Sequence, residues 1–230
     1  MNAKVAIMAS GGSAAVRATT AALAGSGLTV VAVDRSDKGL QDLPGGVRRE
    51  VADMSDPAVA ADVVDRIAAE VGPPDVLVNT IGAFGQGDVL STTPEQRRLM
   101  FDVSLAPALW LSQAAARHMQ RQGSGAIVHV TARPGIEPSG GLAACSGSKA
   151  ALAYLTRILD VELRPHGIRV NAVAPLLIDT PANRAWVPAD MLAHAVSPDA
   201  IAAVIAFLVS DAAAPVSGAI LPAYGTWPTA

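Results

Sequence analysis

The chain alternates short apolar runs with longer stretches in which apolar residues recur every three or four positions. The runs VAIM, TVVAV, VLVN and AIVHV are almost continuously apolar, which is typical of parallel strands covered on both faces. The longer stretches are rich in alanine and leucine and predict helices. The predicted strands are 4–9, 28–33, 48–51, 75–79, 126–131, 168–173 and 219–222. The predicted helices are 14–25, 57–71, 94–121, 145–164 and 199–210.

This alternation predicts an α/β fold with a doubly wound parallel sheet of about seven strands, joined by right-handed βαβ units. No linker or change in composition divides the 230 residues, so we expect one domain over 1–230. Ligands of such sheets bind beyond the carboxyl ends of the strands. The site should therefore be built from the segments ASGGS, DRS, ADMSD, NTIGAFG, TARPG and APLLIDTPANR.

Composition and charge exclude several classes of partner. A net charge of −3 with scattered basic residues argues against nucleic acid and anionic membranes as partners. No single apolar run reaches transmembrane length, and the opening MNAKVAIMAS lacks the pattern of a secretion signal. One cysteine excludes an internal disulfide framework, and no Cys/His spacing suits a metal. We expect a soluble cytoplasmic protein that acts on a small molecule, and the excess of arginine over lysine suggests a high-GC bacterium.

The motifs, taken in order, resemble those of the short-chain dehydrogenase/reductase superfamily, which has a Rossmann-type fold. DVLVNTIG is similar to the Asn-Asn-Ala-Gly stretch of that family, and GAIVHVTARPG to the strand that ends at its catalytic serine. CSGSKAALAYLTRILDVELRPHGIRVNAVAP is similar to the segment from the active-site helix through the sixth strand. DTPANR resembles the branch that includes dihydropteridine reductase. The resemblance covers essentially the whole chain.

Three of the four catalytic positions that the resemblance implies carry other residues. Lys149 is retained, but Cys145 stands where the family has the tyrosine that protonates a carbonyl. Ala132 replaces the serine that polarises the carbonyl, and Ser104 replaces the asparagine that anchors a proton-relay water. Thr131 could substitute for that serine only if the strand end twists, since adjacent strand residues point to opposite faces. We predict that the standard hydride-transfer mechanism is lost, with Lys149, Cys145, Thr131 and Ser104 as candidate catalytic residues.

Cys145 has two interpretations. It lies one helical turn from Lys149 and near a helix N-terminus, and both features lower the pKa of a thiol, so it could be a reactive thiolate. Alternatively, it is a small residue that fills space once a phenol is no longer needed. We favour the second interpretation because no histidine partner is evident.

The cofactor loop that the resemblance implies is also altered. In ASGGSAAV, Ser10, Ala14 and Val16 stand where the family has glycines that let the backbone approach a pyrophosphate. The branched side chain of Val16 should crowd that position. Gly11 and Gly12 would rescue the turn only if it shifts by one residue.

Other cofactor positions are retained. Asp34 ends the second strand, where a carboxylate would bind ribose hydroxyls and favour NAD, although Arg35 beside it would weaken that preference. Asp53 resembles the acid near the adenine, Asn79 a residue that stabilises the sheet, and Thr180 the residue that contacts the carboxamide. Asp34 and Asp53 could equally be loop residues after strands, and Asn79 could be purely structural. We expect NAD(H) binding to be weak or absent. The candidate cofactor-binding residues are Ser10, Gly11, Gly12, Asp34, Asp53, Asn79 and Thr180.

Further polar residues lie near the same edge. Arg133, Glu137 and Asp88 fall on loops around the expected crevice, where they could bind substrate or simply be solvated. His129 lies in the middle of a strand, which favours a packed histidine over a catalyst.

Three hypotheses for function follow, of which we favour the first. The protein is a non-redox enzyme (cyclisation, isomerisation, dehydration or elimination) on a small intermediate of a bacterial biosynthetic pathway. Alternatively, it is an NAD(P)H-dependent ketone reductase whose proton comes from water, Thr131 or the substrate. Thirdly, it is a non-catalytic subunit paired with an active relative. The apolar ALWLSQAAA and AALAYLTRIL predict that helices 94–121 and 145–164 form a homodimer or homotetramer, or a hetero-oligomer with such a relative.

Overall fold

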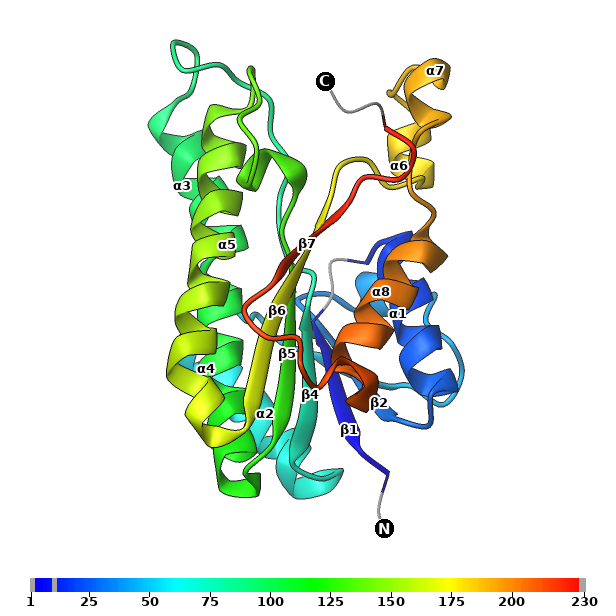
Figure 1. Ribbon diagram of the computed structural model, residues 1–230, viewed down its shortest axis with the longest axis vertical. Helices are drawn as coiled ribbons and strands as arrows, with labels where there is room; N and C mark the ends of the chain where they lie inside the picture. Colours follow the sequence, from blue (N-terminus) through cyan, green and yellow to red (C-terminus); the bar gives the residue numbers. More distant parts are fainter. Residues whose placement is uncertain (1–2, 10–11, 228–230) are drawn as a thin grey trace.

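A seven-stranded, entirely parallel sheet forms the centre of the molecule in the computed structural model, which describes residues 3–9 and 12–227 (Figure 1). The strand order is β3-β2-β1-β4-β5-β6-β7, so the predicted fold class is confirmed. The strands are β1 (Val5–Ala9), β2 (Thr29–Asp34), β3 (Arg48–Val51), β4 (Pro74–Asn79), β5 (Gly125–Val130), β6 (Ile168–Pro175) and β7 (Ile220–Ala223).

Helices cover both faces of this sheet. In Figure 1, α2, α4 and α5 lie on one side, α1 and α8 lie on the other, and the short α6 and α7 extend beyond the carboxyl edge on the α1–α8 side. The α-helices are α1 (Ala14–Gly25), α2 (Pro57–Glu70), α3 (Pro94–Ser104), α4 (Ala106–Gln122), α5 (Ala143–Leu163), α6 (Pro181–Arg184), α7 (Ala189–Leu192) and α8 (Pro198–Val209). Short 3-10 helices are η1 (Asp37–Leu40), η2 (Arg133–Gly135), η3 (Arg164–His166) and η4 (Asp211–Ala213).

The almost continuous apolar character of the strands follows from burial on both faces. In β1, Val5 and Ile7 pack with the core cluster of α2 and α4, whereas Ala6 and Met8 pack with the cluster of α1 and α8. Because successive strand side chains alternate between faces, each central strand contributes to both clusters.

Short polar side chains set where the helices begin. Ser13 caps α1, and its Oγ accepts a hydrogen bond from the backbone N–H of Val16. Thr93 and Gln96 form a reciprocal capping box at the start of α3. Such caps contribute about 1 kcal/mol each, which explains why these starts could be predicted closely.

The predicted helix 94–121 is instead two helices, α3 and α4, which meet at Leu105. Pro107 is the cause, because it lacks a backbone N–H and its ring collides with the carbonyl four residues earlier, at Val103. The break places Val103 and Pro107 on the wall of a cavity described below. The short α6 and α7 were not predicted, since four residues are too few to show a helical period.

Taken together, residues 94–122 are long and apolar enough to cross a membrane, which the individual apolar runs did not suggest. Half of the most apolar window is nevertheless buried inside the protein, and α4 packs against α2 and β4. This is the behaviour of a core helix.

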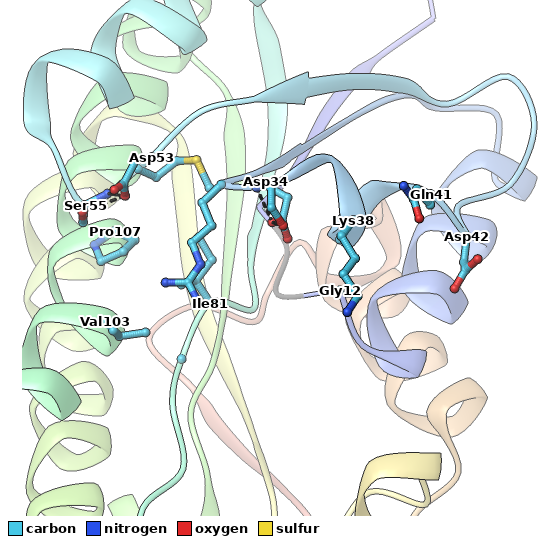
Figure 2. Close-up of a pocket in the computed structure, with 15 residues that line it drawn as sticks. Gly12, Asp34, Lys38, Gln41, Asp42, Asp53, Ser55, Ile81, Val103 and Pro107 are labelled. Carbon is cyan, nitrogen blue, oxygen red and sulfur yellow. Dashed lines mark hydrogen bonds between the residues drawn. The ribbon is translucent and has the colours of Figure 1, made fainter. Parts of the chain in front are cut away.

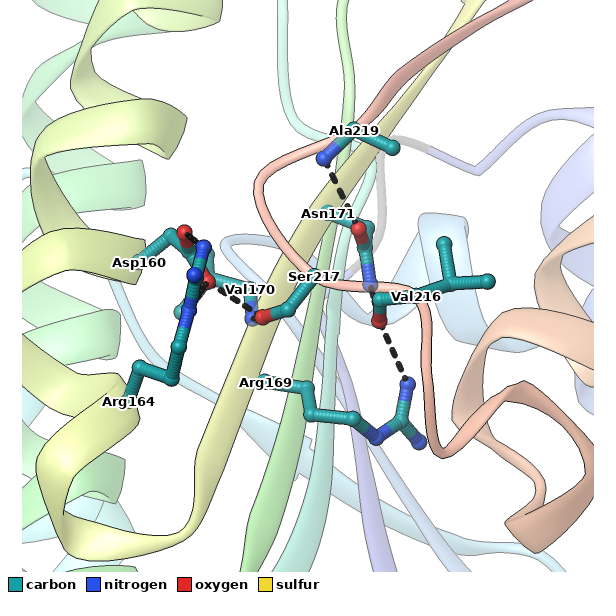
Figure 3. Close-up of polar contacts among 8 residues, drawn as sticks. All are labelled: Asp160, Arg164, Arg169, Val170, Asn171, Val216, Ser217 and Ala219. Carbon is teal, nitrogen blue, oxygen red and sulfur yellow. Dashed lines mark hydrogen bonds and ion pairs between the residues drawn. The ribbon is translucent and has the colours of Figure 1, made fainter.

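A polar network fixes the approach to β7 (Figure 3). Asp160 of α5 is buried, ion-pairs with Arg164 and accepts a hydrogen bond from Ser217. Asn171 of β6 donates to the carbonyl of Val216 and accepts from the N–H of Ala219. The network therefore sets the position at which β7 reaches the carboxyl edge of the sheet.

Candidate active site

Most of the described candidate residues fall into two groups at the carboxyl edge of the sheet. One group borders an open cavity beside β2, and the other surrounds Lys149 between β4, β5 and α5. Ser10 and Gly11 lie outside the described residues, so the candidate loop is described only from Gly12 onward.

The cavity has a volume of about 510 Å³, a size suited to a small-molecule site. It lies between η1, the loop after β3 and the start of α4. Figure 2 shows Asp34 near its centre, Asp53 and Ser55 toward one end, and Lys38 with Gly12 toward the other.

The carboxylate of Asp34 is held in place at the end of β2. Its Oδ1 accepts hydrogen bonds from the N–H and the hydroxyl of Ser36, at 2.9 and 3.2 Å. A Cβ atom at Gly39 would lie 2.4 Å from Asp34 Oδ2, and a Cβ at Gly12, whose φ is +69°, would lie 3.0 Å from Gly39 Cα. Only glycine fits at position 39 without moving this carboxylate. Sequence analysis missed Gly39, whose signal is a glycine five residues after the strand-ending acid.

Asp53 lies at the far end of the cavity and is exposed. It accepts hydrogen bonds from the hydroxyl and the N–H of Ser55, which, together with the charge of Arg35, lower its pKa. Arg35 and Lys38 also line the cavity. The cavity therefore offers both carboxylates and cations to a ligand.

Val16 does not crowd this cavity, contrary to our expectation. Its side chain is 1% exposed and belongs to the core cluster of α1 and α8. It occupies the third position of α1, directed into the core, and is not among the residues that line the cavity. The branched side chain is accommodated by packing in the core, so Val16 takes no space from the cavity.

Lys149 is the buried cation of the second group, with 7% of its surface exposed. Its Nζ donates a long hydrogen bond of 3.4 Å to the carbonyl of Val130. A Cβ at Gly82 would lie 2.4 Å from this Nζ, so the glycine of the NTIG stretch makes room for the amine. Burial lowers the pKa of Lys149, and the nearby Cys145, when ionised, opposes that shift.

The other candidate catalytic residues are placed around Lys149 but are not equivalent. Cys145 is 2% exposed, which fits the space-filling interpretation better than a reactive thiolate. Ser104 is fully buried, and its Oγ has no hydrogen-bond partner among the described residues. It lies 3.8 Å from the point where a Gly82 Cβ would be, so it borders the same space as Lys149 Nζ.

Thr131 has a different role from the catalytic one that we predicted. Its hydroxyl donates to the backbone carbonyl of Lys149 at 2.8 Å, and the residue is 3% exposed. The hydroxyl proton is therefore committed to α5, and Thr131 anchors the helix that carries Lys149. Ala132 beside it offers no polar group.

Asn79 and Thr180 shape the loops that follow their strands. Asn79 is fully buried, and its Oδ1 accepts from the N–H of Ile81 at 3.2 Å, which turns the chain toward Gly82. The hydroxyl of Thr180 caps α6 by accepting from the N–H of Asn183 at 3.2 Å. Both placements support a structural role.

A charged cluster joins η2 to the end of β7. The sequence analysis named its members Arg133 and Glu137 but missed Tyr224. Arg133 Nε donates to Glu137 Oε2 at 2.6 Å, Tyr224 donates to Glu137 Oε1 at 2.9 Å, and the Arg133 guanidinium lies 5.2 Å from the centre of the Tyr224 ring. Burial, together with Glu137, raises the pKa of Tyr224 to about 12. The Tyr224 hydroxyl proton is held by Glu137 in this arrangement.

His129 and Asp88 are structural. His129 is fully buried, bonds to Ser112 and Thr156 at 3.0 and 2.9 Å, and has its pKa lowered to about 4 by burial, so it is a packed neutral histidine as predicted. Asp88 accepts from the N–H groups of Leu90 and Ser91 and thereby holds a turn.

The cavity beside β2 fits the adenosine half of a nicotinamide dinucleotide. The fit rests on the buried Asp34 carboxylate at its wall and on Gly39, where a Cβ atom would displace that carboxylate. The strand order adds to this, because the chain continues from β1 to β2 on one side and from β4 to β5 on the other. Dinucleotides bind at such a switch point.

Comparisons with known proteins agree with this architecture. Residues 12–225 match the family model described as enoyl-(acyl carrier protein) reductase. The chain is 36% identical to cis-4-hydroxycyclohexanecarboxylate dehydrogenase of Sinomonas cyclohexanicum, covering 96% of this chain and 95% of that one. It is 34% identical to galactitol 2-dehydrogenase of Rhizobium johnstonii, covering 94% and 91%. The crystal structure of levodione reductase superposes with a TM-score of 0.88, at 28% identity and covering 98% of each chain. The chain belongs to the short-chain dehydrogenase/reductase superfamily, as its motifs predicted.

Proposed function

We propose that the protein is an NAD(H)-dependent oxidoreductase in which Lys149 supplies the proton that the family takes from a tyrosine. The observation that carries the proposal is the open cavity bordered by Asp34, found in a chain that also keeps Lys149 buried beside Gly82. The similar proteins are named as dehydrogenases and reductases, so we now place the oxidoreductase hypothesis ahead of the non-redox one.

The residues that would hold the dinucleotide follow from the cavity. Asp34 would accept hydrogen bonds from the ribose hydroxyls, which favours NAD(H) over its phosphorylated form. Ile81, Val103 and Pro107 provide an apolar wall for the adenine, and Asp53 lies at its edge. When bound, a nicotinamide supplies the two-electron redox chemistry of the family.

Lys149 would act as the general acid. During reduction of a carbonyl, negative charge develops on the carbonyl oxygen, and the Lys149 ammonium would donate a proton to it. Its lowered pKa suits this task, since a general acid works best when its pKa is near the working pH. The resulting neutral amine would regain a proton from water, and the same amine would accept a proton when an alcohol is oxidised.

The names of the similar proteins indicate a substrate class. The similar proteins are named for galactitol, a hydroxycyclohexanecarboxylate and levodione. We therefore propose that an alcohol and its carbonyl compound form the substrate pair of this chain.

Calorimetric titration with NADH and NADPH tests the cofactor half of the proposal. Wild type should bind NADH more tightly than NADPH, and Asp34→Asn should weaken NADH binding about tenfold or more, since it loses a charged hydrogen bond worth about 1.5–3 kcal/mol. Asp42→Asn changes an exposed carboxylate on the same rim and is the matched control. If the wild type binds neither NADH nor NADPH, the proposal is overturned. The non-redox enzyme and the non-catalytic subunit would then be the remaining hypotheses.

Turnover of Lys149→Met tests the proton donor. Loss of a general acid should lower kcat by about 10²–10⁴-fold while the NADH dissociation constant stays within a factor of about two. In wild type, reduction should slow as the pH rises through the lowered pKa of Lys149, because the ammonium is the active form. An unchanged kcat in Lys149→Met contradicts this role.

A further inference from the structure

Lys149 is a buried amine with few polar partners. Within the described part of the chain, its Nζ donates one long hydrogen bond, to the carbonyl of Val130, and forms no ion pair with a carboxylate. The titratable group that influences it is Cys145, one turn earlier on α5. A buried ammonium has three N–H donors to satisfy, so this environment increases the share of the neutral amine. The neutral amine has a free lone pair and is a nucleophile toward carbonyl carbon.

The amine lies against the wall of the cavity beside β2. A Cβ atom at Gly82 would be 2.4 Å from Lys149 Nζ, and Gly82 itself lines the cavity together with Ile81 and Val103 (Figure 2). The glycine leaves the space beside Nζ free of a side chain. The two apolar neighbours suit a short aliphatic chain. A small molecule that fills this end of the cavity would therefore lie beside the amine.

A hydroxyl without a partner borders the same space. Ser104 Oγ is buried, has no hydrogen-bond partner among the described residues, and lies 3.8 Å from the same Cβ position at Gly82. A buried polar atom without a partner costs free energy, which a ligand oxygen at this point would recover. An amine and a hydroxyl thus border one point, as attack on a carbonyl group requires.

We infer that Lys149 forms a covalent imine with small aliphatic aldehydes. Nζ attacks the carbonyl carbon and a C–N bond forms, while the oxygen, which accepts a hydrogen bond from Ser104, gains the proton that the nitrogen loses. The nitrogen lone pair of this carbinolamine then expels the hydroxyl, which takes a proton from solvent and leaves as water. The iminium ion releases its N–H proton to solvent, which gives the imine.

An aldehyde fits this site better than a ketone does. It has a single carbon substituent, and Lys149 has only 7% of its surface exposed. This activity goes beyond the proposed function, in which the same nitrogen only carries a proton, and it requires no NAD(H).

Reductive trapping of the whole chain without NAD(H) tests the inference. The protein is treated at neutral pH with propanal and sodium cyanoborohydride, which reduces an imine to a stable amine, and the propylated lysines are located by peptide mass spectrometry. The chain has three lysines, and the exposed Lys4 and Lys38 are internal controls for Lys149. Lys149 should be propylated at least about tenfold faster than either, because each unit by which a pKa is lowered gives about tenfold more neutral amine. This preference should disappear in guanidinium chloride, where the chain is unfolded.

Ser104→Ala tests the hydroxyl. It should slow propylation of Lys149 by about 2- to 10-fold, the effect of one hydrogen bond, and leave Lys4 and Lys38 unchanged. Thr20→Val is the matched control and should leave all three rates unchanged. Thr20 also has a buried hydroxyl without a partner among the described residues, but it belongs to α1, on the other side of the sheet from α5 (Figure 1).

Propylation of Lys149 no faster than that of Lys4 and Lys38 overturns the inference, as does a preference for Lys149 that persists in the unfolded chain. An unchanged rate in Ser104→Ala overturns the part assigned to the hydroxyl. The outcome is separable from that of the proposed function. Selective propylation in a protein that binds no NADH refutes only the oxidoreductase proposal, and NADH binding without selective propylation refutes only the imine.

Discussion

Replacing Val16 by glycine, the residue that the family pattern has there, should damage the protein rather than improve its cofactor site. Val16 is 1% exposed and packs in the core between α1 and α8. Burying a valine side chain contributes about 1.5–3 kcal/mol, and a glycine within a helix costs a further 0.5–1 kcal/mol or so. We therefore expect Val16→Gly to lower the free energy of unfolding by about 2–4 kcal/mol.

Urea unfolding followed by circular dichroism measures this loss, with Val59→Gly as the matched control. Val59 is the third residue of α2, as Val16 is the third residue of α1, but it is 37% exposed. The control should lose about 0.5–1 kcal/mol less than Val16→Gly, because more than a third of Val59 is already exposed and the cost of glycine in a helix is the same in both. Calorimetric titration at a temperature where both variants are folded should give NADH affinities like that of the wild type. The reasoning is refuted if Val16→Gly is as stable as Val59→Gly and binds NADH at least tenfold more tightly, because Val16 would then be crowding the pyrophosphate.

Three further predictions concern catalysis, stability and assembly. Cys145→Tyr with Ala132→Ser should raise NADH-dependent reduction of benzaldehyde by up to about 10²–10⁴-fold without any change to the glycine loop; a variant that binds NADH but gains nothing contradicts this. Between pH 6.5 and 4 the unfolded chain binds a proton at His129 that the folded chain does not, so stability should fall by about 3 kcal/mol as the pH drops through that window. Urea unfolding of His129→Gln should lack this component, and an equal pH dependence in both proteins argues against it. Light scattering at micromolar concentration should show at least a dimer that Val161→Glu, on the exposed apolar face of α5, dissociates; a monodisperse wild-type monomer would refute association.

The seven strands, most of the long helices and the family could be predicted from the sequence alone, because their signals are local. Continuous apolar runs mark strands buried on both faces, and capping residues such as Ser13 and Thr93 mark where helices begin. The order of motifs was enough to identify the superfamily, and Asp34 and Lys149 could be chosen as site residues by position. The break at Pro107 also has a local signal that our prediction did not use, a proline within an apolar helical pattern.

Only the tertiary structure decided what the side chains at those positions do. Val16 could face a phosphate or a core, and contacts with α8 place it in the core. Thr131 could face substrate, and the carbonyl of Lys149 takes its hydroxyl instead. The approach of the Lys149 amine to Gly82 has no trace in the local sequence. Spacing along the chain specifies where a residue lies on its own strand or helix, but its partner is set by segments far away in the chain that fold against it.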